Sequence, residues 1–416
     1  MRNYPAIRQK ITWTLFSAQS LVSAAMIAMA TVNAIVGAEL SGVVAWAGVP
    51  AAVLLGASAI GALFWGFLME RNGRRTGLAI GLGIGILGSF LSGWAVINVT
   101  FLLFLAGMAC LGLAQSAMQL GRYAAADVSP SEARGRAIAN VILGGTVGSI
   151  LGPLLVGPAS TRAAMVGFNE LVGAYAVGLM LFVLATVVVV WLLRPEPMVI
   201  ARELAPQQER TSDTNVEVQP LRNIFKRPGV FVASGSMIFG QLVMVMVMII
   251  TSLHMRNSGF LLRDISLVIA AHTFGMFAFS IFSGRLTDRI GRTPVLMFGS
   301  IMLALAGLTA GLFPGILPLG ISLFILGLGW NLCYVGGSTM ITDNLLNLEQ
   351  SRVQGFNDLL LGLVSAIGSL GSGLVFAAIG YRAVGLIGAG LAIIPFVLSL
   401  WWRRNHAPTN LREAAS

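Results

Sequence analysis

The sequence predicts an all-α integral membrane protein with twelve spanning helices, arranged as two related six-helix halves. Apolar residues make up 56% of the chain and charged residues only 10%, whereas soluble domains carry about 25% charged residues. Twelve apolar runs are each long enough to cross a bilayer core, which takes about 20 residues. A short charged motif in the first half recurs 218 residues later. Together these observations exclude a soluble fold.

The twelve apolar runs predict the helices in chain order. They are residues 11–36, 50–69, 78–96, 101–121, 137–156, 171–193, 230–253, 265–283, 295–313, 317–340, 355–379 and 383–402. The first run is too long for the core of a signal peptide, so we expect it to remain as the first helix. Residues 194–228 mix both charge signs with Pro, Gln and Thr, which is typical of a linker. The expected domains are therefore residues 1–193, the linker 194–228, and residues 229–416.

The basic residues behind the formal charge of +10 lie outside the apolar runs, in the segments between them and at the termini, so they do not indicate a nucleic-acid-binding surface. With both termini on one side, all but four of the 26 Lys and Arg residues fall in segments on that side. The four exceptions are Arg162, Arg256, Arg263 and Arg382. Basic residues gather on the cytoplasmic side of bacterial membrane proteins and contact anionic lipid there. We therefore expect an inner-membrane protein with a cytoplasmic linker and termini, whose charge requires no nucleic acid.

A repeated charged motif links the two halves. Gly66-x-x-x-Glu70-Arg71-x-Gly73-Arg74 recurs as Gly284-x-x-x-Asp288-Arg289-x-Gly291-Arg292, and the same spacing relates Arg134 to Arg352. This motif, with Glu70 in place of the usual Asp, resembles the signature of the major facilitator superfamily. The resemblance implies a secondary transporter with alternating access to a site between repeated halves. It also implies a gating network of charges, which we expect to be Glu70, Arg71, Arg74, Asp127, Arg134, Asp288, Arg289, Arg292, Asp343 and Arg352.

The seventh run is rich in methionine. Five methionines fall between Met237 and Met255, where the chain average predicts fewer than one. At 100° per residue, Met244 and Met248 share one face of a helix, with Gln241 on the same stripe and Met246 on the other side. In the next run, His272 and Met276 are one helical turn apart.

These donors are chemically suited to copper. Thioether sulfur is a soft ligand for Cu(I) and imidazole also binds copper, whereas Mn, Mg and Ca prefer oxygen ligands. No acidic residue lies deep within any of the twelve runs. The pair of motifs Met244-x-x-x-Met248 and His272-x-x-x-Met276 resembles the CcoA-like branch of the superfamily, bacterial copper importers that supply cytochrome oxidase assembly. The resemblance implies that these four residues bind copper as a transported substrate, with no prosthetic group.

Other interpretations of the same residues stay open. Methionine is an adaptable apolar filler, and a membrane-embedded histidine also suits proton coupling or an organic ligand. Cys110 and Cys333 can be additional thiol ligands, but a role as small buried apolar residues is favoured. The cysteines lie within apolar runs, so we expect no disulfide.

Two further motifs indicate organic substrates. Gly148-x-x-x-Gly152-Pro153-x-x-x-Gly157-Pro158 resembles a motif of proton-coupled drug antiporters, although Met108 stands where their usual Arg would fall. Riboflavin importers are relatives of the copper branch, and a possible cavity of Gln241, Trp330, Asn331 and Tyr334 can stack and hydrogen-bond an aromatic ring. No nucleophile and base are arranged as in an enzyme. We expect a monomeric transporter in the lipid bilayer and no catalytic activity.

Overall fold

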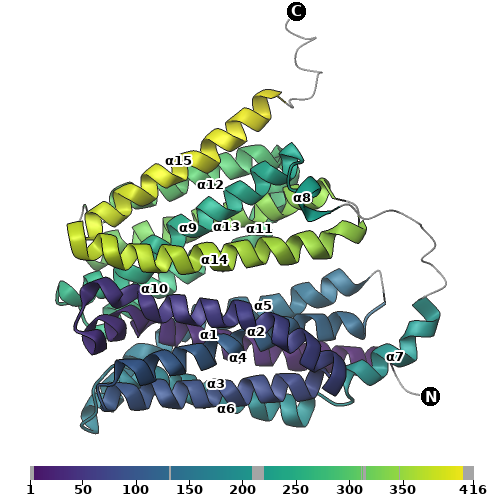
Figure 1. The fold of residues 1–416 in the computed structure, drawn as a ribbon, viewed down its shortest axis with the longest axis horizontal. Coiled ribbons are helices and arrows are strands. Elements are labelled where there is room, and N and C mark those ends of the chain that lie inside the picture. Colours follow the sequence, from purple (N-terminus) through teal and green to yellow (C-terminus); the bar gives the residue numbers. More distant parts are fainter. Residues whose placement is uncertain are drawn as a thin grey trace, which may run out of the picture. The chain divides into compact units, whose positions relative to one another are not determined.

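The computed structural model describes residues 4–130, 133–208, 220–310, 312, 315–345 and 347–405, and all its regular elements there are helices. Twelve segments of this part of the chain are long and apolar enough to cross a membrane, which confirms the predicted fold class. The elements are α1 (Tyr4–Ser41), η1 (Val44–Gly48), α2 (Val49–Asn72), α3 (Arg74–Ile97), α4 (Phe101–Asp127), α5 (Arg134–Met165), α6 (Val172–Leu192), α7 (Pro197–Gln208), α8 (Leu221–Ile224), α9 (Pro228–Asn257), α10 (Leu262–Phe277), α11 (Ser280–Ile290), α12 (Arg292–Thr309), α13 (Ile316–Asp343), α14 (Asn347–Ile379) and α15 (Tyr381–Asn405) (Figure 1).

The chain forms two compact units. Unit 1 comprises Met1–Asn215 and Ser252–Ala270, and unit 2 comprises Val216–Thr251 and Ala271–Ser416. The expected linker, residues 194–228, contains the short helices α7 and α8. The end of α9 and the first half of α10 belong to unit 1, although they follow the linker in the sequence.

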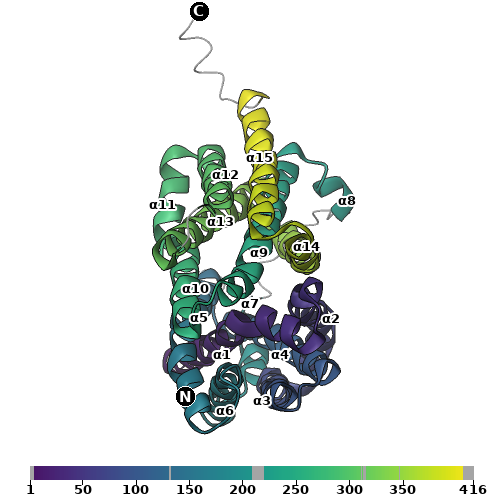
Figure 2. The same cartoon turned by 90° about the vertical axis from the view of Figure 1, so that its left-hand side faces the viewer.

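Unit 1 is built around α1, which packs against α5 and α6 (Figure 2). Gly144, Gly148 and Gly152 lie one turn apart on α5, and a Cβ at each would collide with the backbone of α1. Small residues at this spacing let two helix backbones approach closely. Close packing of α5 on α1 therefore accounts for Gly148 and Gly152 of the motif that resembles drug antiporters, whereas its third glycine, Gly157, lies beside Arg263 of α10.

In unit 2, glycines likewise allow close packing between α12 and α13. A Cβ at Gly299 would meet the backbone of Gly329 and the sulfur of Cys333, so the two helices are in close contact there. A second close approach joins α12 to α15, where Gly307 lies against the backbone of Gly385. These contacts fix α13, which carries several of the candidate site residues.

The eighth apolar run is not one continuous helix. It divides into α10 and α11, with a turn at Ala278 and Phe279. The side-chain amide of Asn331 on α13 donates to the carbonyl of Met276 at 2.6 Å and to the Ser280 hydroxyl at 2.9 Å. Its oxygen accepts from the Ser283 hydroxyl at 2.5 Å. Asn331 thus supplies hydrogen bonds to polar groups on both sides of the break, where buried backbone and side-chain groups need partners.

Candidate functional site

The charged motif forms the same pair in each unit. In unit 1, Arg74 Nε lies 3.0 Å from Asp127 Oδ2, and both side chains are partly buried. In unit 2, Arg292 Nε lies 2.6 Å from Asp343 Oδ2, and its Nη1 lies 3.9 Å from Asp288. Equivalent positions of the repeat therefore tie the start of α3 to the end of α4, and the start of α12 to the end of α13.

The remaining charges of the expected gating network lie near these pairs in the sequence and are mostly exposed. Glu70 and Arg71 end α2, Arg289 lies near the end of α11, and Arg134 and Arg352 lie near the starts of α5 and α14. The ion pairs of Arg74 and Arg292 are made with Asp127, Asp288 and Asp343 rather than with these five residues. Their gating role stays a prediction.

Glu196 is a partner that the sequence motif does not reveal. Its carboxylate accepts hydrogen bonds from the backbone N–H of Arg74 at 2.7 Å and of Arg75 at 3.2 Å. These are two of the free N–H groups at the start of α3, where a negative charge is favourable. Arg75 also donates to the carbonyl of Val190 at 2.6 Å, so the end of α6 is bound to the same point.

Ion pairs of two further arginines, Arg227 and Arg256, were also missing from the sequence-based prediction. Arg227 binds Glu349 with two parallel bonds of 2.8 and 2.9 Å, and Glu349 is almost fully buried. Such a bidentate pair is the strong form of this interaction. Within unit 1, Arg256 Nη1 lies 2.6 Å from Glu170, and its Nε lies 3.9 Å from Glu39 at the end of α1.

The methionine stripe of α9 is in register with α13. Met237 fills the space beside Gly337, Gly240 lies against Cys333, and the indole N–H of Trp330 donates to Gln241 at 2.6 Å. Numbers on α9 rise as those on α13 fall, so the two helices are antiparallel.

Extension of this register predicts two levels for the expected ligands. Three residues beyond the Gln241 and Trp330 pair, Met244 is expected level with Gly327; seven residues beyond it, Met248 is expected level with Leu323. The helical rise of about 1.5 Å per residue separates these levels by about 6 Å. Met244 is buried and Met248 is half-buried. Met246 points to a different neighbour, Gly368 of α14.

His272 and Met276 pack against α13 at the same two levels. His272 Nδ1 lies 2.9 Å from the carbonyl oxygen of Leu323, and a Cβ at Gly327 would meet the backbone nitrogen of Met276. A carbonyl only accepts, so Nδ1 carries the proton. The ring is fully buried, and Nε2 has no hydrogen-bond partner among the described residues. In the neutral ring, that atom carries a free lone pair.

The aromatic residues of α13 form a rigid platform. The rings of Trp330 and Tyr334 stack with centroids 5.0 Å apart and an interplanar angle of 25°. Gln241 holds the indole and in turn donates to Ser365 at 2.8 Å. Asn331, expected beside them, is instead committed to the break between α10 and α11.

The cysteines occupy packing positions. Cys333 is buried between α12 and α13, and Cys110 lies where a Cβ at Gly88 would contact it. Within the described residues, no three His, Cys, Asp or Glu side chains are arranged to hold a metal ion. The expected copper ligands, one imidazole and three thioethers, are a different kind of donor set.

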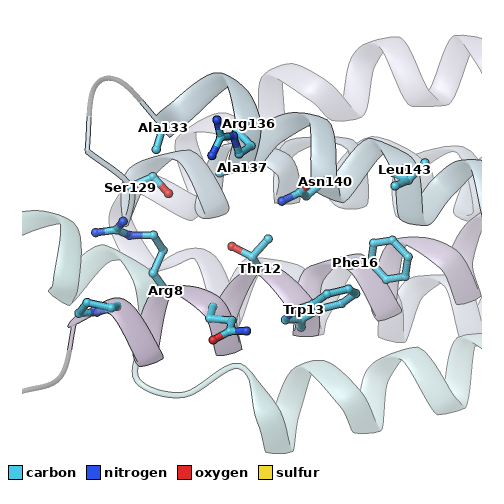
Figure 3. A pocket seen from close by; sticks show the side chains of 12 residues that line it. Arg8, Thr12, Trp13, Phe16, Ser129, Ala133, Arg136, Ala137, Asn140 and Leu143 are labelled. Carbon is cyan, nitrogen blue, oxygen red and sulfur yellow. The ribbon is translucent and has the colours of Figure 1, made fainter. Parts of the chain in front are cut away.

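A cavity of about 560 Å³ lies within unit 1, between the first turns of α1 and the first turns of α5 (Figure 3). Arg8 and Arg136 lie toward one end, and Phe16 lies toward the other. The sequence-based prediction did not identify this cavity, because it depends on two helices that are more than 100 residues apart.

Comparisons with known proteins agree with this architecture. Residues 11–262 and 246–416 match the model of the Major Facilitator Superfamily. The uncharacterized MFS-type transporter YdeG of Bacillus subtilis is 34% identical, over 91% of this chain and 89% of its own length. The riboflavin transporter RfnT of Brucella anthropi is 27% identical, over 96% of this chain and 98% of its own. The crystal structure of the nucleoside transporter NupG shares the fold, with a TM-score of 0.69 and 16% identity over 96% of this chain and 99% of that one.

Proposed function

Because the chain belongs to the Major Facilitator Superfamily and is a multi-pass secondary transporter, we propose that it imports copper across the bacterial inner membrane by alternating access. Met244, Met248, His272 and Met276 would be the copper-binding residues, as the resemblance to the CcoA-like branch implies. Copper is the cargo in this proposal, and it would be supplied to cytochrome oxidase assembly.

The observation that carries the proposal is the environment of His272. Metal-binding histidines generally donate one ring N–H to a carbonyl or carboxylate, which fixes the ring and leaves the other nitrogen for the metal. His272 has this arrangement, with Nδ1 on the Leu323 carbonyl and Nε2 buried without a partner among the described residues. An unsatisfied polar atom in an apolar interior is costly, so it calls for a ligand.

The remaining proposed ligands are the thioethers of α9 and α10, which are described by their height along α13. In the extended register, Met248 would share its level with His272, and Met244 would share its level with Met276. Each level would then offer one donor from α9 and one from α10, which suits a soft ion that passes from one two-coordinate position to the next. Because the levels are about 6 Å apart along the helices, the ion can exchange ligands stepwise rather than leave all of them at once.

A flat organic molecule is the second candidate cargo. The stacked rings of Trp330 and Tyr334, held by Gln241, can bind an aromatic ring by stacking and hydrogen bonding. The likeness to a riboflavin transporter supports this alternative. Both candidate cargoes would bind near α9 and α13. Substitutions of the methionines and substitutions of the aromatic residues can therefore distinguish copper from an organic cargo.

Uptake measured in parallel separates these cargoes. Cells that lack other importers would be supplied with radioactive copper, riboflavin or a cationic dye, with and without the protein. We expect copper to accumulate, and we expect Met248→Leu to stop that accumulation. Riboflavin accumulation that depends on Trp330 and not on Met248 would contradict the copper proposal and favour the second candidate. Dye extrusion without copper uptake would favour drug efflux.

A further inference from the structure

The cavity between α1 and α5 has a polarity that none of the proposed transport steps uses. Two guanidinium groups mark one end of it, where Arg8 and Arg136 project from opposite helices beside Ser129 (Figure 3). Thr12 and Asn140 line the middle, and Trp13 and Phe16 line the part farther along α1. The cavity therefore changes from cationic to apolar along its length.

The cationic end is not neutralised by the lining. The described residues that line the cavity include no carboxylate. The Arg8 side chain donates a hydrogen bond from Nε to the Val128 carbonyl at 3.3 Å, and this neutral acceptor does not cancel the positive charge. Arg136 is exposed and points into the same space. Two guanidinium groups that line the same end of a cavity favour an anion there.

The apolar end adds a second requirement for the ligand. Trp13 is 59% exposed, and its ring packs edge-on against Phe16 with centroids 5.2 Å apart. An exposed aromatic pair beside a cavity offers a surface for an aromatic ring or an acyl chain. The volume of about 560 Å³ lies in the range of sites for small organic molecules.

From this arrangement we infer that unit 1 carries a binding site for an amphipathic organic anion. The anionic group lies between Arg8 and Arg136, Asn140 and Thr12 donate hydrogen bonds to its polar portion, and the apolar portion rests on Trp13 and Phe16. An anionic lipid and a soluble aryl phosphate share this chemistry. The site lies entirely within unit 1 and is independent of the copper proposal.

Binding of 1-naphthyl phosphate to the full-length protein tests the site. The protein would be placed in nanodiscs of phosphatidylcholine, and affinity would be measured by isothermal titration calorimetry. Arg8→Gln and Arg136→Gln should each weaken binding by about tenfold or more, because each removes a hydrogen bond to a charged group. Trp13→Ala should weaken binding of naphthyl phosphate but not of inorganic phosphate.

Arg162→Gln is the matched control. It removes the same charge from the last turn of the same helix, far along α5 from the cavity, and should leave the affinity unchanged. Equal affinity in the Arg8, Arg136 and Arg162 variants would overturn the proposal, as would equal binding of neutral 1-naphthol. Thermal unfolding of each variant checks that it is folded.

Two further arms identify the occupant and test a neighbouring acid. Replacing part of the phosphatidylcholine by phosphatidylglycerol weakens naphthyl phosphate binding if a lipid occupies the site, and leaves it unchanged if the natural ligand is soluble; both agree with an anion site.

Glu132 lies outside the described residues, two positions before Arg134 in the sequence. Glu132→Gln should preserve or strengthen anion binding. Loss of binding in that variant would contradict the site.

Discussion

The imidazole Nδ1 of His272 lies 2.9 Å from the carbonyl oxygen of Leu323. This contact joins α10 to α13 and turns the buried Nε2 of the ring away from any hydrogen-bond partner among the described residues. Extension of the α9–α13 register predicts that Met248 is level with Leu323, which would bring the histidine motif and the methionine motif to one depth.

One substitution can distinguish the roles of the two ring nitrogens of His272. In His272→Asn, the side-chain amide can still donate to the Leu323 carbonyl, but nothing replaces Nε2. We expect the variant to be expressed and folded, with thermal stability within a few degrees of the wild type, and to lose copper uptake. Uptake at the wild-type level would mean that Nε2 does not bind the ion.

The gate should depend on one ion pair in each unit. Arg74→Gln and Arg292→Gln each leave an aspartate without its partner, and removing one member of a partly buried pair costs more than the loss of an exposed pair. Transport per molecule should fall severalfold in both variants. Arg404→Gln removes an exposed charge near the end of α15 and is the control. Equal transport in all three, at equal protein level, would argue against a gate built on these pairs.

The break between α10 and α11 should depend on Asn331. Asn331→Leu removes the partner of the Met276 carbonyl and of the buried Ser283 hydroxyl, at a cost of about 1–3 kcal/mol for each buried group left unsatisfied. The Ser280 hydroxyl keeps its bond to the Phe277 carbonyl at 2.9 Å. We expect a marked drop in thermal unfolding temperature in detergent. Asn98→Leu, at the exposed end of α3, should have little effect. A small and equal change in both would show that the break does not need the amide.

The side on which the linker lies can be tested directly. The Arg210→Cys variant places a thiol in the linker, outside the described residues, and both native cysteines lie within helices. If the linker is cytoplasmic, an impermeant maleimide should label Cys-substituted protein only after the cells are opened. Labelling of intact cells at position 210 would overturn the proposed topology.

The fold was predictable because its determinants are local. A run of about 20 apolar residues is sufficient to specify a membrane helix, and all twelve runs correspond to segments of that kind in the structure. The repeated charges were also informative. Arg74 and Asp127 are far apart in sequence, but both belong to a motif whose spacing the second half repeats, and the structure contains both pairs.

What the sequence could not supply depends on contacts between distant segments. The run at residues 265–283 reads as one helix, and its break is visible only once Asn331 is seen to bind the freed groups. In the sequence alone Glu196 belongs to the linker, yet its carboxylate accepts hydrogen bonds from the first N–H groups of α3. The cavity between α1 and α5 likewise requires that two helices be placed side by side.

The methionine series tests the central claim most directly. Met to Leu conserves volume and usually costs under about 1.5 kcal/mol in a packed site, so a loss of uptake in a well-expressed variant reports a lost ligand. Met246 is the internal control, since it faces Gly368 of α14 rather than α13.

The measurement is accumulation of radioactive copper by cells that lack other importers and express Met244→Leu, Met248→Leu, Met246→Leu or the wild type at equal levels. The account predicts that Met244→Leu and Met248→Leu abolish accumulation, while Met246→Leu accumulates copper at close to the wild-type rate. Copper accumulation that is the same in all four strains, or absent from the wild type, would contradict it.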